Sequence, residues 1–173
     1  MHAHRGRLTG VQRQVGNRAR GHMPSLDDYL TMRLHSAGGE PTFAMLEIVN
    51  GAEVPAAEMD SAAVCALTEM AILVAALDND RHSFAREAGD LHTDQNVFTV
   101  LMRHQDVPLE TAVRRAVALR DRVLCRFLAL RRKVLPQASR ELRRYLTDLG
   151  HGIRGNAEWG LLAPRYLVRE QAG

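Results

Sequence analysis

Aromatic residues and lysine are scarce in this 173-residue chain. Phe, Trp and Tyr make up 5% of the residues, and lysine occurs only as Lys133, so arginine supplies nearly all of the positive charge. A nucleic-acid-binding surface typically needs stacking aromatics or a focused basic patch. Here the arginines are spread over several segments and the net charge is only +3. Nucleic acid is therefore not the expected partner.

Long apolar runs and an export signal are also missing. No stretch of about 18 or more apolar residues occurs, so the sequence indicates no membrane span. The first residues are polar and basic and no apolar signal core follows them, so we expect a cytoplasmic protein. The two cysteines, Cys65 and Cys125, each lie in an apolar helical pattern, which predicts two buried thiols rather than a disulfide.

Helical signals recur along the chain, and no β alternation is found, so we predict an all-α fold. Ser25 is a predicted N-cap. A helix over about 61–88 is apolar nearly all round as far as Leu77, which predicts that it is the central helix. Residues 1–20 are expected to be a weakly ordered N-terminal segment before a domain over 21–169. Further helices are expected over about 42–50, 94–104, 108–135 and 140–162.

Three residues with side-chain oxygens lie at the end of the predicted central helix. Asn79, Ser83 and Glu87 are spaced i, i+4 and i+8, which places them on one helix face. Amide, hydroxyl and carboxylate oxygens together suit Mg²⁺, which often shares its coordination with a substrate phosphate. Polar groups at the end of a buried helix cost free energy unless they are paired or bind something. The residues therefore suggest a magnesium site, with an exposed and capped helix end as the alternative.

The same segment resembles a known metal motif. Asn79-Asp80-x-x-Ser83-x-x-Arg86-Glu87 matches, at every specified position, the second metal motif of class I terpene synthases. That motif has Asn or Asp, then Asp, two free positions, Ser or Thr, two more free positions, a basic residue and an acidic residue.

Two other segments resemble the same family and occur in its order. The segment from Tyr29 to Gly38, with Arg33 inside it, resembles the diphosphate-sensing arginine and effector turn of the bacterial enzymes. Trp159 followed by Arg165-Tyr166 resembles their terminal Arg-Tyr pair. The resemblance covers about residues 11–169. It implies the C-terminal half of the class I terpene synthase helical barrel.

The resemblance also implies a chemistry, the ionisation and cyclisation of a linear prenyl diphosphate with Mg²⁺ as cofactor and release of diphosphate. The substrate would be of the farnesyl or geranyl type. Asn79, Ser83 and Glu87 would each offer one oxygen to Mg²⁺. The basic and tyrosine side chains would bind the diphosphate, and two small residues would form the effector turn. These further site residues are Arg33, Arg165, Tyr166, Ser36 and Ala37.

The aspartate-rich motif that class I terpene synthases carry upstream is absent from this sequence. Asp27-Asp28 does not supply it, because no acidic residue follows at the required spacing. We therefore expect this chain alone to be inactive, with a missing N-terminal half or self-association covering apolar faces that would otherwise be exposed. The alternative function is a non-catalytic helical binding module that contacts a phosphate-rich partner.

Overall fold

The structure is a computed structural model that describes residues 2–89 and 95–166, with side chains for 5–85 and 95–166. The described residues form helices and connecting turns, with no strand among them, which confirms the predicted all-α fold. The elements are α1 (His2–Ala19), α2 (Leu26–Ser36), α3 (Gly39–Ala44), α4 (Leu46–Asn50), α5 (Ala56–Met59), α6 (Ala62–Gly89), α7 (Val97–Gln105), α8 (Leu109–Val134), η1 (Leu135–Gln137), α9 (Arg140–Leu162) and η2 (Pro164–Tyr166).

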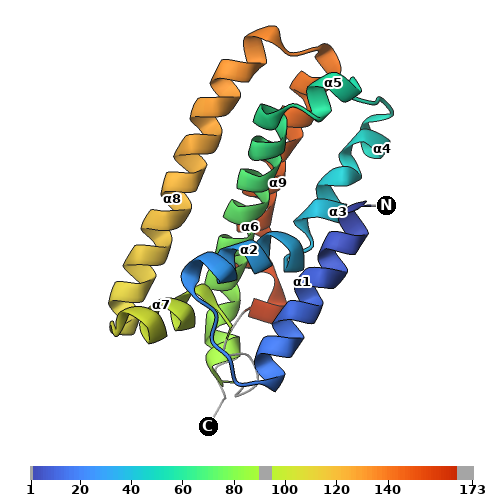
Figure 1. Ribbon diagram of the computed structural model, residues 1–173. Helices are drawn as coiled ribbons and strands as arrows, with labels where there is room; N and C mark the ends of the chain where they lie inside the picture. The colour runs from blue at the N-terminus through green and yellow to red at the C-terminus, as the bar shows by residue number, and fades with distance from the viewer. Residues whose placement is uncertain (1, 90–94, 167–173) are drawn as a thin grey trace.

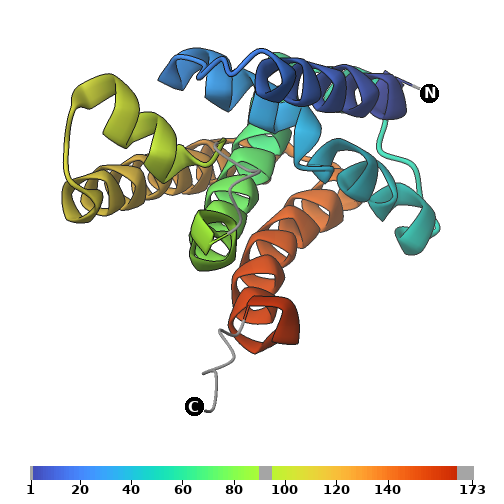
Figure 2. The same ribbon diagram turned by 90° about the horizontal axis from the view of Figure 1, so that it is seen from below.

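The central helix is α6, as predicted. It packs along α8 on one side and along α9 on the other, and α2 crosses it (Figure 1). Seen from below, α6 lies between α8 and α9, while α1 runs along another side of the bundle (Figure 2). By length and composition, Ala62–Ala85 is the one described stretch that would suffice to cross a membrane. Packing between two other helices also accounts for its apolar character.

Two apolar clusters follow one another along α6. In the first, Leu67 lies with Phe127 of α8 and Leu146 of α9. In the second, Leu77 lies with Tyr29 of α2 and with residues of α7 and α8. All five of these side chains are at most 4% exposed. The polar residues that follow Leu77 therefore begin inside the second cluster.

Where the sequence suggests a weakly ordered segment over 1–20, the structure has the 18-residue helix α1. This helix packs on α2 and α3. Gly6 and Gly10, one turn apart, permit the close approach. A Cβ added at Gly10 would lie 2.7 Å from both the Cβ of His35 and the backbone nitrogen of Ser36. The close packing of helix backbones, which composition does not show, explains the difference.

Both cysteines are free, as expected, but both are exposed. The prediction of buried thiols is therefore wrong. Cys65 and Cys125 each lie two residues before a core residue, Leu67 and Phe127 respectively. Two residues correspond to a rotation of about 200° around a helix. Each thiol therefore points away from the core, toward which the leucine or phenylalanine two residues later points.

Local contacts fix the start of α2 and the turn that follows it. Ser25 begins α2 by accepting a hydrogen bond from the backbone N–H of Asp28 at 3.2 Å, as predicted. Gly38 has φ of 80°, which favours glycine, and it ends the turn after α2. A Cβ on Gly39 would lie 2.8 Å from side-chain carbons of Ile72 in α6. The turn is therefore seated directly against the central helix.

Leu146→Ala should lower the free energy of unfolding by about 2–5 kcal/mol, because it opens a cavity in a fully buried cluster. The matched control is Leu128→Ala, since Leu128 on α8 is 50% exposed and its truncation should cost about 0.5 kcal/mol or less. Urea unfolding followed by circular dichroism measures both changes. Equal losses for the two variants would contradict the assigned core.

Candidate metal- and anion-binding site

Three consecutive polar residues near the middle of α6 reach three different neighbours. Successive residues of a helix are rotated by about 100°. Asp78 pairs with Arg120 of α8, and Asp80 pairs with Arg33 of α2. Asn79, between them in sequence, faces an open pocket and contacts η2. The site is thus built from one helix whose faces are each tied to a separate element.

Asp80 is the buried node of the site. It accepts hydrogen bonds from Nη2 of Arg33 at 2.7 Å and from the hydroxyl of Tyr29 at 2.6 Å. Tyr29 and Arg33 are four residues apart on α2, so both reach the same carboxylate. The side chain of Asn96 donates to the Asp80 carbonyl at 2.9 Å, and its oxygen caps α7 by accepting from the N–H of Phe98. Asp80 therefore joins α2 and the start of α7 to α6.

Asn79 lies between the arginine of α2 and the tyrosine of η2. Its Nδ2 donates to the hydroxyl of Tyr166 at 2.6 Å. Its Oδ1 is 3.5 Å from Nη2 of Arg33, a long contact, and the same nitrogen is 3.4 Å from the carbonyl of Ala76. The amide thus uses its nitrogen to hold η2, and its oxygen stays only weakly engaged.

Six of the eight predicted site residues line one open pocket of about 450 Å³. Its walls come from α1, the turn between α2 and α3, α6, α9 and η2. Three arginines line it, and no carboxylate is among its described lining residues, so the pocket suits an anion. The predicted residues in it are Arg33, Ser36, Ala37, Asn79, Arg165 and Tyr166.

An aromatic cluster holds Arg165 at the pocket. Its guanidinium carbon is 4.7 Å from the ring centroid of Tyr166 and 5.7 Å from that of Trp159. Trp159 is half-exposed, so it is a wall of the pocket and not part of the core. His82 packs against Tyr166 with ring centroids 5.9 Å apart. Burial, assisted by the charge of Arg81, lowers the pKa of His82.

The predicted metal ligands are described only in part. Asn79 lines the pocket, while Ser83 is buried and donates to the Asp80 carbonyl at a long 3.4 Å. Glu87 belongs to α6, but its side chain lies outside the described residues. Those residues contain no group of three or more His, Cys, Asp or Glu that could hold a metal. The amide and hydroxyl oxygens that are described fit a hard cation in chemical type.

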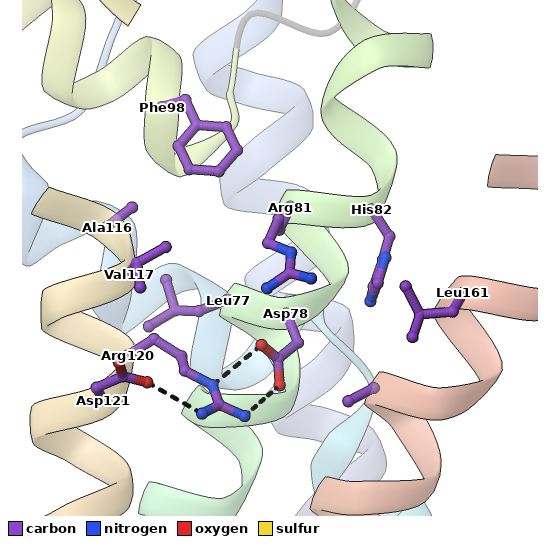
Figure 3. A pocket seen from close by; sticks show the side chains of 11 residues that line it. Leu77, Asp78, Arg81, His82, Phe98, Ala116, Val117, Arg120, Asp121 and Leu161 are labelled. Atoms are coloured by element: carbon purple, nitrogen blue, oxygen red, sulfur yellow. Dashed lines mark hydrogen bonds and ion pairs between the residues drawn. The ribbon is translucent and has the colours of Figure 1, made fainter. Parts of the chain in front are cut away.

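A second pocket, of about 160 Å³, lies on another face of α6, between α8 and α9 (Figure 3). There Arg120 makes two hydrogen bonds of 3.0 Å to Asp78 and one of 3.1 Å to Asp121. Burial opposes the charge of Arg120, but the hydrogen bonds and charge of Asp78 outweigh it and raise the pKa of the guanidinium. His82 lines the same pocket, and a Cβ on Gly160 of α9 would collide with its ring. Close packing and the ion pair together fix α6 between its neighbours.

A mainly apolar pocket of about 590 Å³ adjoins the anion pocket and shares Phe43 and Ile72 with it. One wall carries the hydroxyls of Thr68 and Tyr145, which lie 2.9 Å apart. Burial raises the pKa of Tyr145, which favours its neutral form. Most of its exposed lining is apolar, but Glu40, Glu47, Asp60 and Glu69 also line it. A pocket lined by arginines therefore lies beside a larger one that is mainly apolar but has acidic residues in its wall.

Four residues of the site received no role from the sequence. Tyr29 precedes Arg33 by one helical turn, so their shared face could have been found from spacing. Asp80 belongs to the recognised motif, but the motif does not say which arginine it pairs with. Asn156 lines the pocket and donates to a backbone carbonyl of α6 at 3.0 Å. Arg7 enters the pocket from α1, and no motif of the sequence indicates it.

Comparison with known proteins identifies the family. Residues 2–126 match the family model described as terpene synthase family 2, C-terminal metal binding. The chain belongs to this terpene synthase family. It is 60% identical over 165 residues to spiroviolene synthase of Streptomyces violens. The matched region covers 95% of this chain and 46% of that protein.

Solved structures share the fold. The SVS_A2 protein from ancestral sequence reconstruction superposes with a TM-score of 0.86 at 66% identity, covering 92% of this chain and 47% of that one. The 2-methylisoborneol synthase of Streptomyces coelicolor A3(2) gives 0.91 at 20% identity, covering 98% and 54%. The chain spans about half the length of the curated relatives it matches. The predicted family and C-terminal half are therefore confirmed.

Asp80→Asn should destabilise the chain by about 3 kcal/mol or more, because it leaves the buried guanidinium of Arg33 without its counter-charge. Glu110→Gln is the control, since it breaks the solvent-exposed pair with Arg114 and should cost about 0.5 kcal/mol or less. Urea unfolding measures both. A loss for Asp80→Asn no larger than that of the control would show that the buried pair does not hold α2 to α6.

Proposed function

We propose that this chain carries the metal- and diphosphate-binding half of a Mg²⁺-dependent terpene cyclase. The observation that carries the proposal is the convergence of Arg33, Asn79, Arg165 and Tyr166 on one positively charged pocket, although they come from three distant parts of the sequence. The reaction is the ionisation and cyclisation of a linear prenyl diphosphate with release of diphosphate. A relative that is 35% identical is named as a farnesyl diphosphate cyclising (+)-T-muurolol synthase, which supports a substrate of the farnesyl or geranyl type.

In this proposal the pocket binds the diphosphate. Arg33 and Arg165 donate hydrogen bonds to its oxygens, since a guanidinium matches phosphate geometry. The hydroxyl of Tyr166 adds a further donor beside Asn79. Ser36 and Ala37 lie on the pocket wall at the end of α2, where the turn can respond to a bound anion. The adjoining apolar pocket would hold the hydrocarbon chain.

Asn79, Ser83 and Glu87 are the proposed Mg²⁺ ligands. The family description supports a metal in this half of the protein, and the 2-methylisoborneol synthase that shares the fold was solved with Mg²⁺ and geranyl-S-thiolodiphosphate. When bound, Mg²⁺ supplies Lewis acidity that stabilises the charge of the departing diphosphate. The chain's own residues bind and orient that diphosphate beside the apolar pocket.

Uncovered apolar stripes support the view that this chain is one part of the catalytic unit. Leu8, Val11 and Val15 follow one face of α1 and are 39–64% exposed. Ile48 and Val49 on α4 are more than 70% exposed. Exposed apolar side chains that gather on one face of a helix are typical of an interaction site. We propose that a polypeptide with the aspartate-rich motif covers these stripes and that the chain alone does not turn over substrate.

The proposed metal site predicts Mg²⁺-dependent binding of pyrophosphate. Asn79→Ala combined with Glu87→Gln should abolish that dependence, because two of three oxygen ligands are removed. Glu110→Gln is the control, since Glu110 on α8 is exposed and lines neither the anion pocket nor the adjoining apolar pocket, and this variant should bind as the unmodified chain does. Isothermal titration with and without Mg²⁺ measures the affinities. Pyrophosphate binding that is unchanged in the double variant, together with salt-dependent binding of nucleic acid, would favour the alternative binding module.

The incomplete catalytic unit predicts no turnover by the chain alone. Incubation with geranyl, farnesyl or geranylgeranyl diphosphate and Mg²⁺ should give no cyclised product by gas chromatography with mass spectrometry. A cyclised product formed at a rate that depends on Glu87 would contradict this expectation. Sedimentation of the same sample would show whether a second copy covers the stripes.

A further inference from the structure

We propose that Arg7 of α1 is a third arginine that binds the substrate diphosphate, beside Arg33 and Arg165. This inference rests on the proposed function, because it assigns a further residue to the same anion pocket. Arg7 lies outside the three segments that resemble family motifs. Its place in the site follows from how α1 packs, from the backbone that it covers and from the charges that surround it.

The packing of α1 directs Arg7 into the pocket. Arg7 follows Gly6 directly and precedes Gly10 by three residues, so it lies on the face of α1 that approaches the turn between α2 and α3. Both glycines meet atoms of His35 closely. Any side chain at Gly10 would need movement of the backbone at Ser36. The close contact sets which face of α1 meets the turn, and the exposed side chain of Arg7 on that face lines the pocket.

The guanidinium of Arg7 covers the effector turn. The position of a Cβ on Gly38 lies 3.6 Å from Cζ and Nη1 of Arg7 and 3.8 Å from Nε. Gly38 has no side chain and has φ of 80°, so the turn presents bare backbone to the arginine. An anion bound by Arg7 and Arg33 together would thus join α1 to the turn that follows α2. This contact gives the turn a second connection to the diphosphate.

Charge compensation separates Arg7 from Arg33. Arg33 forms a buried ion pair with Asp80, so much of its charge is already balanced. Arg165 packs on aromatic rings, which leave its positive charge in place. Within the described part of the chain, Arg7 forms no ion pair. The charge available to an incoming diphosphate therefore comes mainly from Arg7 and Arg165, and guanidinium groups bind phosphate oxygens with charge-assisted hydrogen bonds.

The test measures the affinity of the whole chain for pyrophosphate in Mg²⁺ by isothermal titration. Arg7→Gln should weaken binding about tenfold, the loss of one charge-assisted contact. Arg7→Lys should recover part of the affinity, because the charge is kept and the planar fork is lost. The matched control is Arg13→Gln, since Arg13 is exposed on the same helix and does not line the pocket. Its affinity should stay within about twofold of the unmodified chain.

A second variant tests the placement of α1. Gly10→Leu should push α1 away from the turn and weaken pyrophosphate binding without touching Arg7. The double variant with Arg7→Gln should then be little weaker than either single variant, since both remove the same contact. Additive losses would show that Arg7 does not act through the position of α1. Circular dichroism checks that each variant keeps its helices. If Gly10→Leu does not fold, the comparison of the single variants Arg7→Gln and Arg13→Gln decides whether Arg7 binds pyrophosphate.

The outcomes separate this inference from the proposed function. If the unmodified chain does not bind pyrophosphate, the proposed function and this inference are both overturned. If the chain binds pyrophosphate in a manner that depends on Asn79 and Glu87, but Arg7→Gln behaves like Arg13→Gln, only the role of Arg7 is overturned.

Discussion

The buried ion pair between Asp80 and Arg33 is the constraint on which the site depends. A charged carboxylate inside a helical core is tolerated only when its partners satisfy it, and here Arg33 and Tyr29 both do. Because these two residues belong to α2, the pair fixes that helix against α6. Ser36 at the end of α2, and the turn that follows it, are set in place by the same contact. The ion pair between Asp80 and Arg33 thus positions one wall of the anion pocket.

The same pair sets the electrostatics of the pocket. The carboxylate of Asp80 pairs with Arg33 and does not line the pocket where an anion would bind. Asn79, which does line that pocket, contributes a neutral amide. Asp78 likewise points away from the anion pocket, toward Arg120 of α8 (Figure 3). Two acids flank the motif asparagine in sequence, but neither lines the anion pocket. Helix geometry accounts for this separation, since adjacent residues point about 100° apart.

Local patterns predicted the parts of the molecule that depend on local physics. The cap at Ser25, the central helix and the pocket residue Asn79 follow from hydrogen-bonding preference, apolar periodicity and motif spacing. Helix α1 was not predicted, because its stability comes from contact with α2 and α3 and its own composition favours no helix. The exposure of Cys65 could not be predicted either, since a helix that is apolar nearly all round does not show which face meets a neighbour. Arg7 belongs to this second group.

The contacts of the run Asp78-Asn79-Asp80 fix the rotation of α6 about its own axis relative to its neighbours. One residue inserted between Leu77 and Asp78 would turn all three side chains by about 100° around the helix axis. Each side chain would then lose its present partner and face a different neighbouring element. The same insertion before Ser61 would lengthen the connection between α5 and α6 and leave the orientation of these three residues unchanged. Length variation during descent should therefore collect at the ends of α6. The interior of this helix can exchange side chains but cannot gain or lose a single position.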